Sequence, residues 1–169
     1  MDTKMWNERF QQAEYIYGEA PNDFLVNELA KLPPGKLLLP CEGEGRNAVY
    51  AAKLGWTVDA FDFAEQGLQK AEQLARKHNV SFNNFWVTEA ESFRPEQATY
   101  DAVGLAYCHI APESRYAFHQ RLVSSLSPGG TVIFEAFAED QLAYNSGGPP
   151  VKARLFTAEA LQREFEGLN

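Results

Sequence analysis

Residues 36–54 constrain the fold of this chain more than any other segment. Three consecutive leucines, at 37–39, predict a buried strand, and a tight acidic turn with glycines at positions 43 and 45 follows them. A helix is predicted to begin at Arg46. Glycines in such a turn, and free backbone amides at the start of a helix, let a ligand lie against the main chain. The segment therefore predicts the first strand–turn–helix of a nucleotide-binding α/β unit.

Strands and helices are predicted to alternate through most of the chain. The predicted strands span 36–41, 57–62, 84–88, 101–107 and 131–137. The predicted helices span 3–14, 23–32 (capped by Asn22), 46–54, 65–78 and 112–126, and Thr157 caps a last one. Apolar strands that alternate with helices predict an α/β fold with a doubly wound, mostly parallel, Rossmann-like sheet. We expect a single domain over 1–169, with an N-terminal helical segment (1–32), a five-stranded core (36–137) and a final loop and helix (138–169).

The composition excludes several classes of partner. The 169 residues carry a formal net charge of −8, and nucleic-acid binding depends on Lys and Arg that neutralise phosphates, so we expect no nucleic-acid partner. No apolar run is long enough to cross a membrane, and the N-terminus has no apolar signal core, which predicts a cytoplasmic protein without a membrane partner. The two cysteines, Cys41 and Cys108, lack the spacing of metal ligands. We expect reduced thiols and no metal site.

Two classes of cofactor fit the glycine turn. Gly43, Gly45 and Ala48 match the loose dinucleotide fingerprint, and Asp62 lies 19 residues after Gly43, where a ribose-binding acid is expected. Dehydrogenases and methyltransferases share this pattern. The alternatives are that the glycines only serve a tight turn and that Asp62 caps the following helix.

The charge of the turn favours one class over the other. Glu42 and Glu44 flank Gly43, and carboxylates at contact distance repel a diphosphate. S-adenosylmethionine has no phosphate and carries a sulfonium and an ammonium, which these carboxylates would attract. The turn is therefore interpreted as a site for S-adenosylmethionine, with solvated loop carboxylates as the alternative.

The residues on either side of this turn resemble a known family. The run EGEGRNAVYAAKLGWTVDAFDFAEQGLQKA resembles class I S-adenosylmethionine-dependent methyltransferases, and in particular the small bacterial group related to tellurite-resistance and thiopurine methyltransferases. The opening WNERFQQAEYIYGEAPNDFL resembles the lid of that group, and YDAVGLAYCHIAPESR and SPGGTVIFEAF resemble its fourth and fifth strands. In this chain Leu39 and Cys41 replace the usual acid and first glycine.

The resemblance implies which residues hold the cofactor. It implies that the methionine part contacts the turn and the start of its helix, that the ribose and adenine bind after the second and third strands, and that Tyr107 lies at the methyl-transfer site. The implied cofactor residues are Glu42, Gly43, Gly45, Arg46, Asn47, Asp62, Phe63, Glu89, Ala90 and Tyr107.

Three residues are predicted to act in catalysis. His109 follows the fourth strand, where α/β active sites lie, and its ordinary pKa suits a general base; the alternative is a hydrogen bond to the backbone. Tyr107 and Tyr17 lie at a strand end and in a loop, where sites form. His78 and His119 fall on predicted helices and are expected at the surface.

The leading hypothesis is an enzyme, a methyltransferase that acts on a small-molecule nucleophile. The alternatives are an NAD(P)-dependent oxidoreductase and a non-catalytic binding module. Because the chain stops where the resembling proteins continue into further strands, the C-terminal strands are apparently missing. We expect either a truncated fragment or a homodimer that covers the sheet edge.

Overall fold

The computed structural model describes residues 3–144 and 146–168, built around a five-stranded sheet with strand order β3-β2-β1-β4-β5. All four pairings are parallel, which confirms the predicted α/β sheet. The strands are β1 (Lys36–Pro40), β2 (Thr57–Asp62), β3 (Asn84–Val87), β4 (Tyr100–Ala106) and β5 (Leu126–Glu135).

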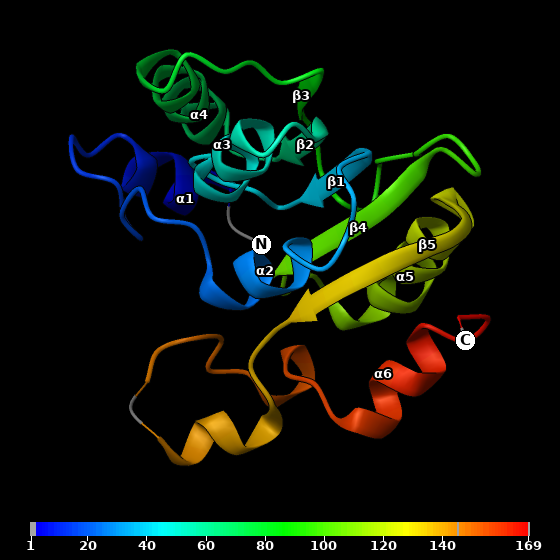
Figure 1. The fold of residues 1–169 in the computed structure, drawn as a ribbon. Helices are drawn as coiled ribbons and strands as arrows, with labels where there is room; N and C mark the ends of the chain where they lie inside the picture. Colours follow the sequence, from blue (N-terminus) through cyan, green and yellow to red (C-terminus); the bar gives the residue numbers. More distant parts are fainter. Residues whose placement is uncertain (1–2, 145, 169) are drawn as a thin grey trace.

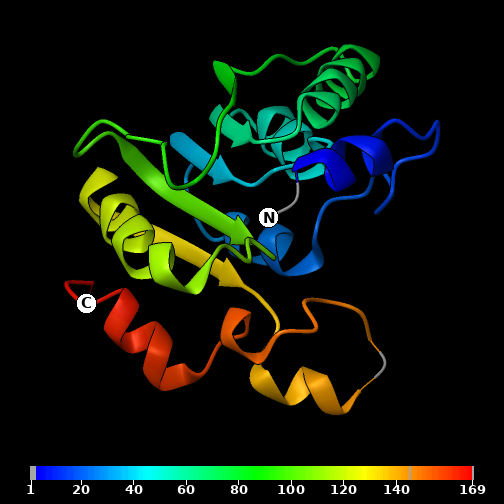
Figure 2. The same cartoon turned by 180° about the vertical axis from the view of Figure 1, so that it is seen from behind.

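Helices cover both faces of the sheet. In Figure 1 α2 and α3 lie in front of the sheet, and Figure 2 shows α5 on the opposite face. Leu37 packs with Leu25 and Ala48 on the first face, whereas Leu38 packs with Phe118 on the second, because successive side chains of a strand point to opposite sides. The helices are α1 (Thr3–Phe10), α2 (Asp23–Leu29), α3 (Arg46–Lys53), α4 (Glu65–Lys77), α5 (Pro112–Ser125) and α6 (Ala158–Glu164).

Both predicted helix caps are confirmed. The side chain of Asn22 accepts the Leu25 N–H at 3.0 Å, and the side chain of Thr157 accepts the Ala160 N–H at 3.1 Å. Several element boundaries differ from the prediction, and the helix predicted over 23–32 ends at Leu29. The first helix ends at Phe10 rather than at residue 14. The last strand begins at Leu126 rather than at residue 131, and residues 127–130 form an irregularity inside it.

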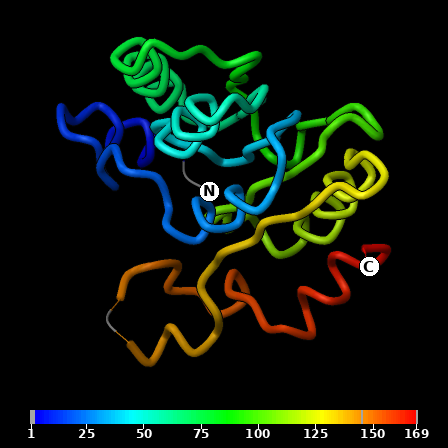
Figure 3. Tube along the Cα trace, viewed as in Figure 1, coloured from blue at the N-terminus to red at the C-terminus, as the bar shows by residue number. Residues whose placement is uncertain are grey.

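The chain after β5 leaves the sheet and then returns to it. Figure 3 shows this segment looping out from the end of β5 before it reaches α6. It contains two short 3-10 turns, η1 (Glu139–Ala143) and η2 (Lys152–Arg154). A parallel bridge between Ala138 and Phe156 closes the loop, so residues 152–156 lie near the carboxyl end of β5.

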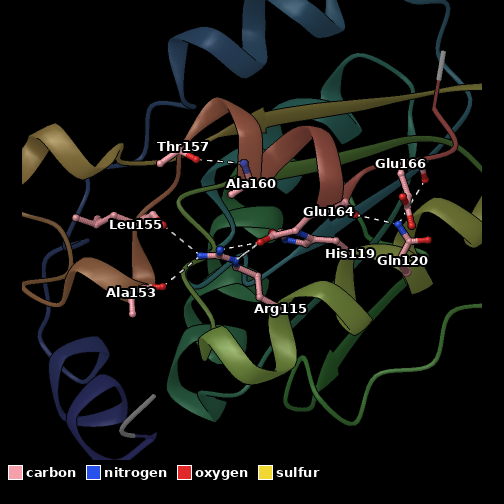
Figure 4. A network of polar contacts seen from close by, with 9 residues as sticks. All are labelled: Arg115, His119, Gln120, Ala153, Leu155, Thr157, Ala160, Glu164 and Glu166. Atoms are coloured by element: carbon pink, nitrogen blue, oxygen red, sulfur yellow. Dashed lines mark hydrogen bonds and ion pairs between the residues drawn. The ribbon is translucent and has the colours of Figure 1, made fainter.

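A buried polar network fastens α6 to α5 (Figure 4). The Arg115 guanidinium donates through Nε to both carboxylate oxygens of Glu164, at 2.8 and 3.0 Å. Its Nη1 donates to the Leu155 carbonyl at 3.2 Å. His119 Nδ1 lies 2.9 Å from Glu164. The expectation of a surface His119 was wrong, because its side chain is 0% exposed. Its carboxylate partner lies 45 residues away in sequence, so the local helical pattern held no sign of this burial.

Within the described ranges, no helix combines the length and the apolar character that a bilayer crossing requires.

Candidate functional site

The site is the crevice at the point where the strand order reverses. β1 and β4 are neighbours, yet the chain continues from them toward opposite edges of the sheet. In open α/β sheets ligands bind outside the carboxyl ends of the strands at this point. The segments that follow β1 and β4, residues 41–45 and 107–111, therefore border the candidate site.

The turn after β1 is held by its own chain. Gly43 and Gly45 have φ values of 59° and 84°, a conformation that favours glycine. A β-carbon on Gly45 would lie 2.5 Å from the Ala71 side chain, and one on Gly43 would lie 3.3 Å from the Phe10 ring. The positive φ values and the close packing of α1 and α4 against the turn favour glycine at both positions. Their role in cofactor binding stays a prediction.

Glu42 is a buried acid in the turn after β1. Its Oε1 accepts the Ala48 N–H at 2.7 Å, at the start of α3. Asn47 Nδ2 lies 3.5 Å from the other oxygen. Burial raises the pKa of Glu42 to about 7, against the lowering effect of these hydrogen bonds. The carboxyl therefore titrates near neutral pH.

Glu44 has a different environment. It forms a buried ion pair with Lys70, and its other oxygen accepts the Ile16 N–H at 2.8 Å. Lys70 also donates to the carbonyls of Gln12 and Glu14. The interpretation that both glutamates would attract a cationic cofactor was wrong for Glu44, whose charge Lys70 neutralises. Glu44 instead fastens the N-terminal segment to α4.

Asp62, at the end of β2, accepts a hydrogen bond from the backbone of the turn. Its Oδ2 accepts the Gly43 N–H and its Oδ1 accepts the Ala64 N–H, both at 2.9 Å. Burial raises the pKa of Asp62, and the two backbone hydrogen bonds oppose this rise. The carboxylate thus joins the turn to Ala64, which is the N-cap residue of α4, so Asp62 is not itself the helix cap of the alternative.

A small cavity lies beside the turn. It has a volume of about 110 Å³ and brings together three predicted cofactor residues, Phe63, Glu89 and Ala90. Sequence reasoning missed Thr3 and Ile110, which also line it. The family resemblance covers a segment that includes Ile110, but only the fold shows that α1 reaches this cavity.

Aromatic and charged side chains gather on the other side of the crevice, after β4 and β5. The Tyr107 hydroxyl donates to Glu135 Oε1 at 2.7 Å, and the Tyr107 ring lies 4.9 Å from that of Phe137. Two residues from other segments also interact. Arg46, at the start of α3, donates to the carbonyl of Tyr17, in the loop before α2, at 3.1 Å, and its guanidinium lies 5.8 Å from the centre of the Tyr17 ring. Sequence reasoning missed Glu135, whose only signal was its place at the carboxyl end of a strand.

His109 is buried between backbone groups. Its Nδ1 lies 2.9 Å from the Arg154 carbonyl, and its Nε2 lies 3.4 Å from the Phe137 nitrogen. Burial lowers the pKa of His109, which is 6% exposed, and the Arg154 carbonyl opposes this effect. A neutral ring that donates from Nδ1 and accepts at Nε2 satisfies both contacts. This is the backbone-bonded alternative that the sequence left open, and the role of His109 as a base stays a prediction.

The two cysteines are paired in the structure. Cys41 follows β1 and Cys108 follows β4, and a disulfide joins them with their Cα atoms 5.6 Å apart. The expectation of separate reduced thiols was wrong, because neighbouring parallel strands bring residues 67 positions apart into contact. Elsewhere, no three His, Cys, Asp or Glu side chains of the described residues group as metal ligands.

Comparisons with known proteins match this chain to methyltransferases. The profile of a methyltransferase domain matches residues 39–130. Thiocyanate methyltransferase 1 of Brassica oleracea is 28% identical over 133 residues, which are 77% of this chain and 57% of that protein. The Arabidopsis thaliana protein of the same name is 27% identical over 135 residues, 78% of this chain and 58% of its own length. The chain thus spans less than two thirds of these relatives.

A solved structure supports the fold. TehB from Haemophilus influenzae superposes with a TM-score of 0.70 at 16% identity, covering 97% of this chain and 54% of TehB. At this identity the match bears on the fold alone.

Proposed function

The chain belongs to the methyltransferase domain family, and on this basis we propose that it transfers the methyl group of S-adenosylmethionine to a small-molecule nucleophile. The observation that carries the proposal is the family match over residues 39–130, since this range contains the acidic turn and most of the cavity beside it. The match of the chain to thiocyanate methyltransferases, whose name specifies a small acceptor, supports the same class of reaction.

The residues at the crevice fit this cofactor. The turn offers a buried carboxyl, Glu42, to the positively charged part of the molecule. The cavity offers the ring of Phe63 and the apolar surface of Ala90 to the adenine, with the Glu89 carboxylate available to its amino group. We propose that Asp62 binds the ribose, and that Gly43, Gly45, Arg46 and Asn47 border the methionine part.

When bound, S-adenosylmethionine supplies a methyl carbon activated by positive sulfur. The protein then has to orient the nucleophile and exclude water. Phe10 lies on the turn, packed 5.3 Å from the ring of Trp6, so α1 shields this side of the crevice from solvent. On the acceptor side we propose that Tyr107 and Tyr17 contact the substrate. The contacts of His109 favour a positioning role, in which it holds residues 152–156 against the end of β4.

Calorimetric titration with S-adenosylhomocysteine and with NADH tests the cofactor. We expect binding of the first and no binding of the second. Binding of NADH alone would support an oxidoreductase, and binding of neither would support a non-catalytic module.

Substitution of Asp62 tests the ribose contact. Asp62→Ala should weaken S-adenosylhomocysteine binding at least several-fold. Asp101→Ala is the matched control, because the Asp101 carboxylate also accepts a backbone N–H, that of Lys36 at 2.7 Å, but at the opposite end of the sheet. Equal affinity of the two variants would remove the ribose role.

We also propose that a second copy of the chain covers the outer edge of β5. Among the described residues β5 pairs only with β4, and unpaired strand edges tend to be covered. A groove of about 390 Å³ with an apolar lining, which includes Phe24, Phe134 and Leu161, lies beside this edge. Sedimentation velocity over a range of concentrations should reveal a dimer, and a monomer at every concentration would contradict the proposal.

A further inference from the structure

Tyr107 has a backbone conformation that aromatic residues rarely adopt. Its φ of 57° lies in the left-handed region, which is strained for a bulky residue. Two backbone hydrogen bonds hold it there, from its own N–H to the Glu135 carbonyl at 2.8 Å and from the His109 N–H to its carbonyl at 3.0 Å. Such strain is concentrated at functional sites. Here it accompanies a side chain that remains 38% exposed at the end of β4.

The Tyr107 hydroxyl donates to a carboxylate that can accept a further hydrogen bond. Its proton points to Glu135 Oε1 at 2.7 Å, a charge-assisted hydrogen bond. The second oxygen, Oε2, is buried and has no hydrogen-bond partner among the described residues. Because the hydroxyl donates to Glu135, the lone pairs of its oxygen are free to accept a hydrogen bond from another molecule.

The pair lies on the acceptor side of the crevice. Ala106, the last residue of β4, pairs in register with Glu135, the last residue of β5, so both side chains follow from the carboxyl ends of neighbouring strands. β4 also pairs with β1, which leads into the acidic turn. Tyr107 therefore lies between the proposed cofactor site and Glu135.

We infer that Tyr107 and Glu135 form a proton relay that accepts the proton of a neutral methyl acceptor. The inference rests on the proposed function and specifies its substrate class. The acceptor gives its proton to the Tyr107 oxygen while the Tyr107 proton passes to Glu135. The acceptor atom forms a bond to the methyl carbon with its own electron pair, and the carbon–sulfur bond breaks with its pair remaining on sulfur.

This arrangement selects acceptors by charge. A hydroxyl, thiol or amine N–H can donate to the Tyr107 oxygen and lose its proton there. An anion such as thiocyanate has no proton to give and would approach a carboxylate of the same charge, which is unfavourable at short range. The expected acceptor is therefore a neutral nucleophile that carries a proton.

The ionisation of Tyr107 agrees with a relay that ends on Glu135. Burial and the hydrogen bond to Glu135 raise the pKa of Tyr107 to about 12, and the charge of Arg46, the other charged group that acts on this phenol, opposes the rise. The phenol therefore stays protonated near neutral pH and passes a proton on, rather than acting as a base alone.

A titration of the free protein tests the coupling of the pair. Tyrosine labelled with ¹³C at Cζ reports each phenol by NMR, and Tyr107→Phe assigns the signal. We expect Glu135→Gln to lower the pKa of Tyr107. Tyr116 and Glu166 form a matched control, because the Tyr116 hydroxyl donates to Glu166 at the same 2.7 Å on an exposed surface. Glu166→Gln should leave Tyr107 unchanged. An unchanged Tyr107 titration in Glu135→Gln would overturn the coupling.

Methyl transfer to defined acceptors tests the substrate class. Phenol, imidazole and propanethiol serve as neutral probes and thiocyanate as the anionic one, with radiolabelled S-adenosylmethionine. We expect turnover of at least one neutral probe. Glu135→Gln and Tyr107→Phe should lower kcat at least about 100-fold, and Glu135→Gln should leave cofactor affinity within about twofold. Glu135→Asp should restore part of the rate, and Glu166→Gln should match the unsubstituted protein.

The outcomes separate this inference from the proposed function. A protein that does not bind S-adenosylmethionine refutes the function itself. A protein that binds it but methylates only thiocyanate, or none of the four probes, overturns the inference. So does a Glu135→Gln variant with an unchanged kcat and pH–rate profile.

Discussion

Two glutamates in one turn have different electrostatic environments. Glu42 and Glu44 are both buried, yet only Glu44 has a cationic partner, Lys70. The sequence predicted an acidic turn, but it could not predict which acid keeps its charge available. Lys70 lies on α4, 26 positions after Glu44, and its ammonium reaches the turn only because α4 packs against it. At this site the sequence shows where the acids lie, but contacts between distant segments determine which acid has a cationic partner.

The ionisation of Glu42 should control cofactor affinity. Because burial raises its pKa to about 7, the carboxyl loses its charge as the pH falls below neutral. The ionised form attracts the cationic part of S-adenosylmethionine, so affinity should rise up to about tenfold between about pH 6 and pH 8. Calorimetric titration across this range measures it.

Glu42→Gln should remove this pH dependence and leave the affinity low throughout. Glu65→Gln, at the exposed first residue of α4, should retain the dependence. A flat profile in the unsubstituted protein would show that Glu42 does not act on the cofactor.

At the scale of elements, the stability of the last helix depends on buried charged side chains, because the helix is short. α6 has seven residues, which is too short for independent stability. Its Glu164 joins Arg115 and His119 of α5 in the network of Figure 4. The same segment carries the Arg154 carbonyl that contacts His109. The network therefore places a group that touches the candidate site.

Breaking the network should destabilise the protein strongly. Glu164→Gln leaves the Arg115 guanidinium buried without its counter-ion, at a cost of about 3–5 kcal/mol. The combined change Arg115→Met and Glu164→Leu should cost less, because no buried charge remains. Urea unfolding measures both. Glu28→Gln removes the exposed pair with Lys31 and should cost about 1 kcal/mol or less; an equally small effect of Glu164→Gln would argue against a buried pair.

The disulfide links the two segments that border the crevice. Protein denatured without reductant should expose no reactive thiol, and reduced protein should expose two. Because the bond closes a long segment of chain, reduction should lower the free energy of unfolding by about 2–4 kcal/mol. A thiol assay and urea unfolding with and without reductant test this, and two thiols before reduction would refute the pairing.

For the molecule as a whole, periodicity predicted the sheet well and the segment from β5 to the C-terminal helix poorly. The LLL, VDAF and AVGLAY runs are apolar because both faces of the sheet are covered, and this made β1, β2 and β4 recognisable. β5 was harder, since Pro128 and the glycines beside it signal a turn even though the strand extends across them. Contacts between distant segments, such as His119 with Glu164, left no local pattern to read.

Stability should fall on the acid side because of His119. Burial lowers the pKa of His119 to about 4, from an ordinary value of 6.5. Below about pH 6.5 the unfolded chain binds a proton that the folded protein excludes, so this contribution to stability is lost as the pH falls toward about 4. His119→Gln should lose less free energy of unfolding over this interval than the unsubstituted protein.

His78→Gln, at the end of α4, is the control and should follow the unsubstituted protein. Chemical denaturation at several pH values measures all three proteins. Parallel curves for His119→Gln and the unsubstituted protein would exclude His119 as the source of the loss.

The position of α1 has a practical consequence for anyone who handles this protein. Thr3 lines the small cavity, and Phe10 rests against Gly43. A purification tag fused ahead of Thr3 would therefore begin beside the cavity and would obstruct a titrated ligand. Fusion after α6, which Figure 1 shows on the far side of β5 from α1, leaves the entrance to the cavity open for crystal soaking and calorimetry.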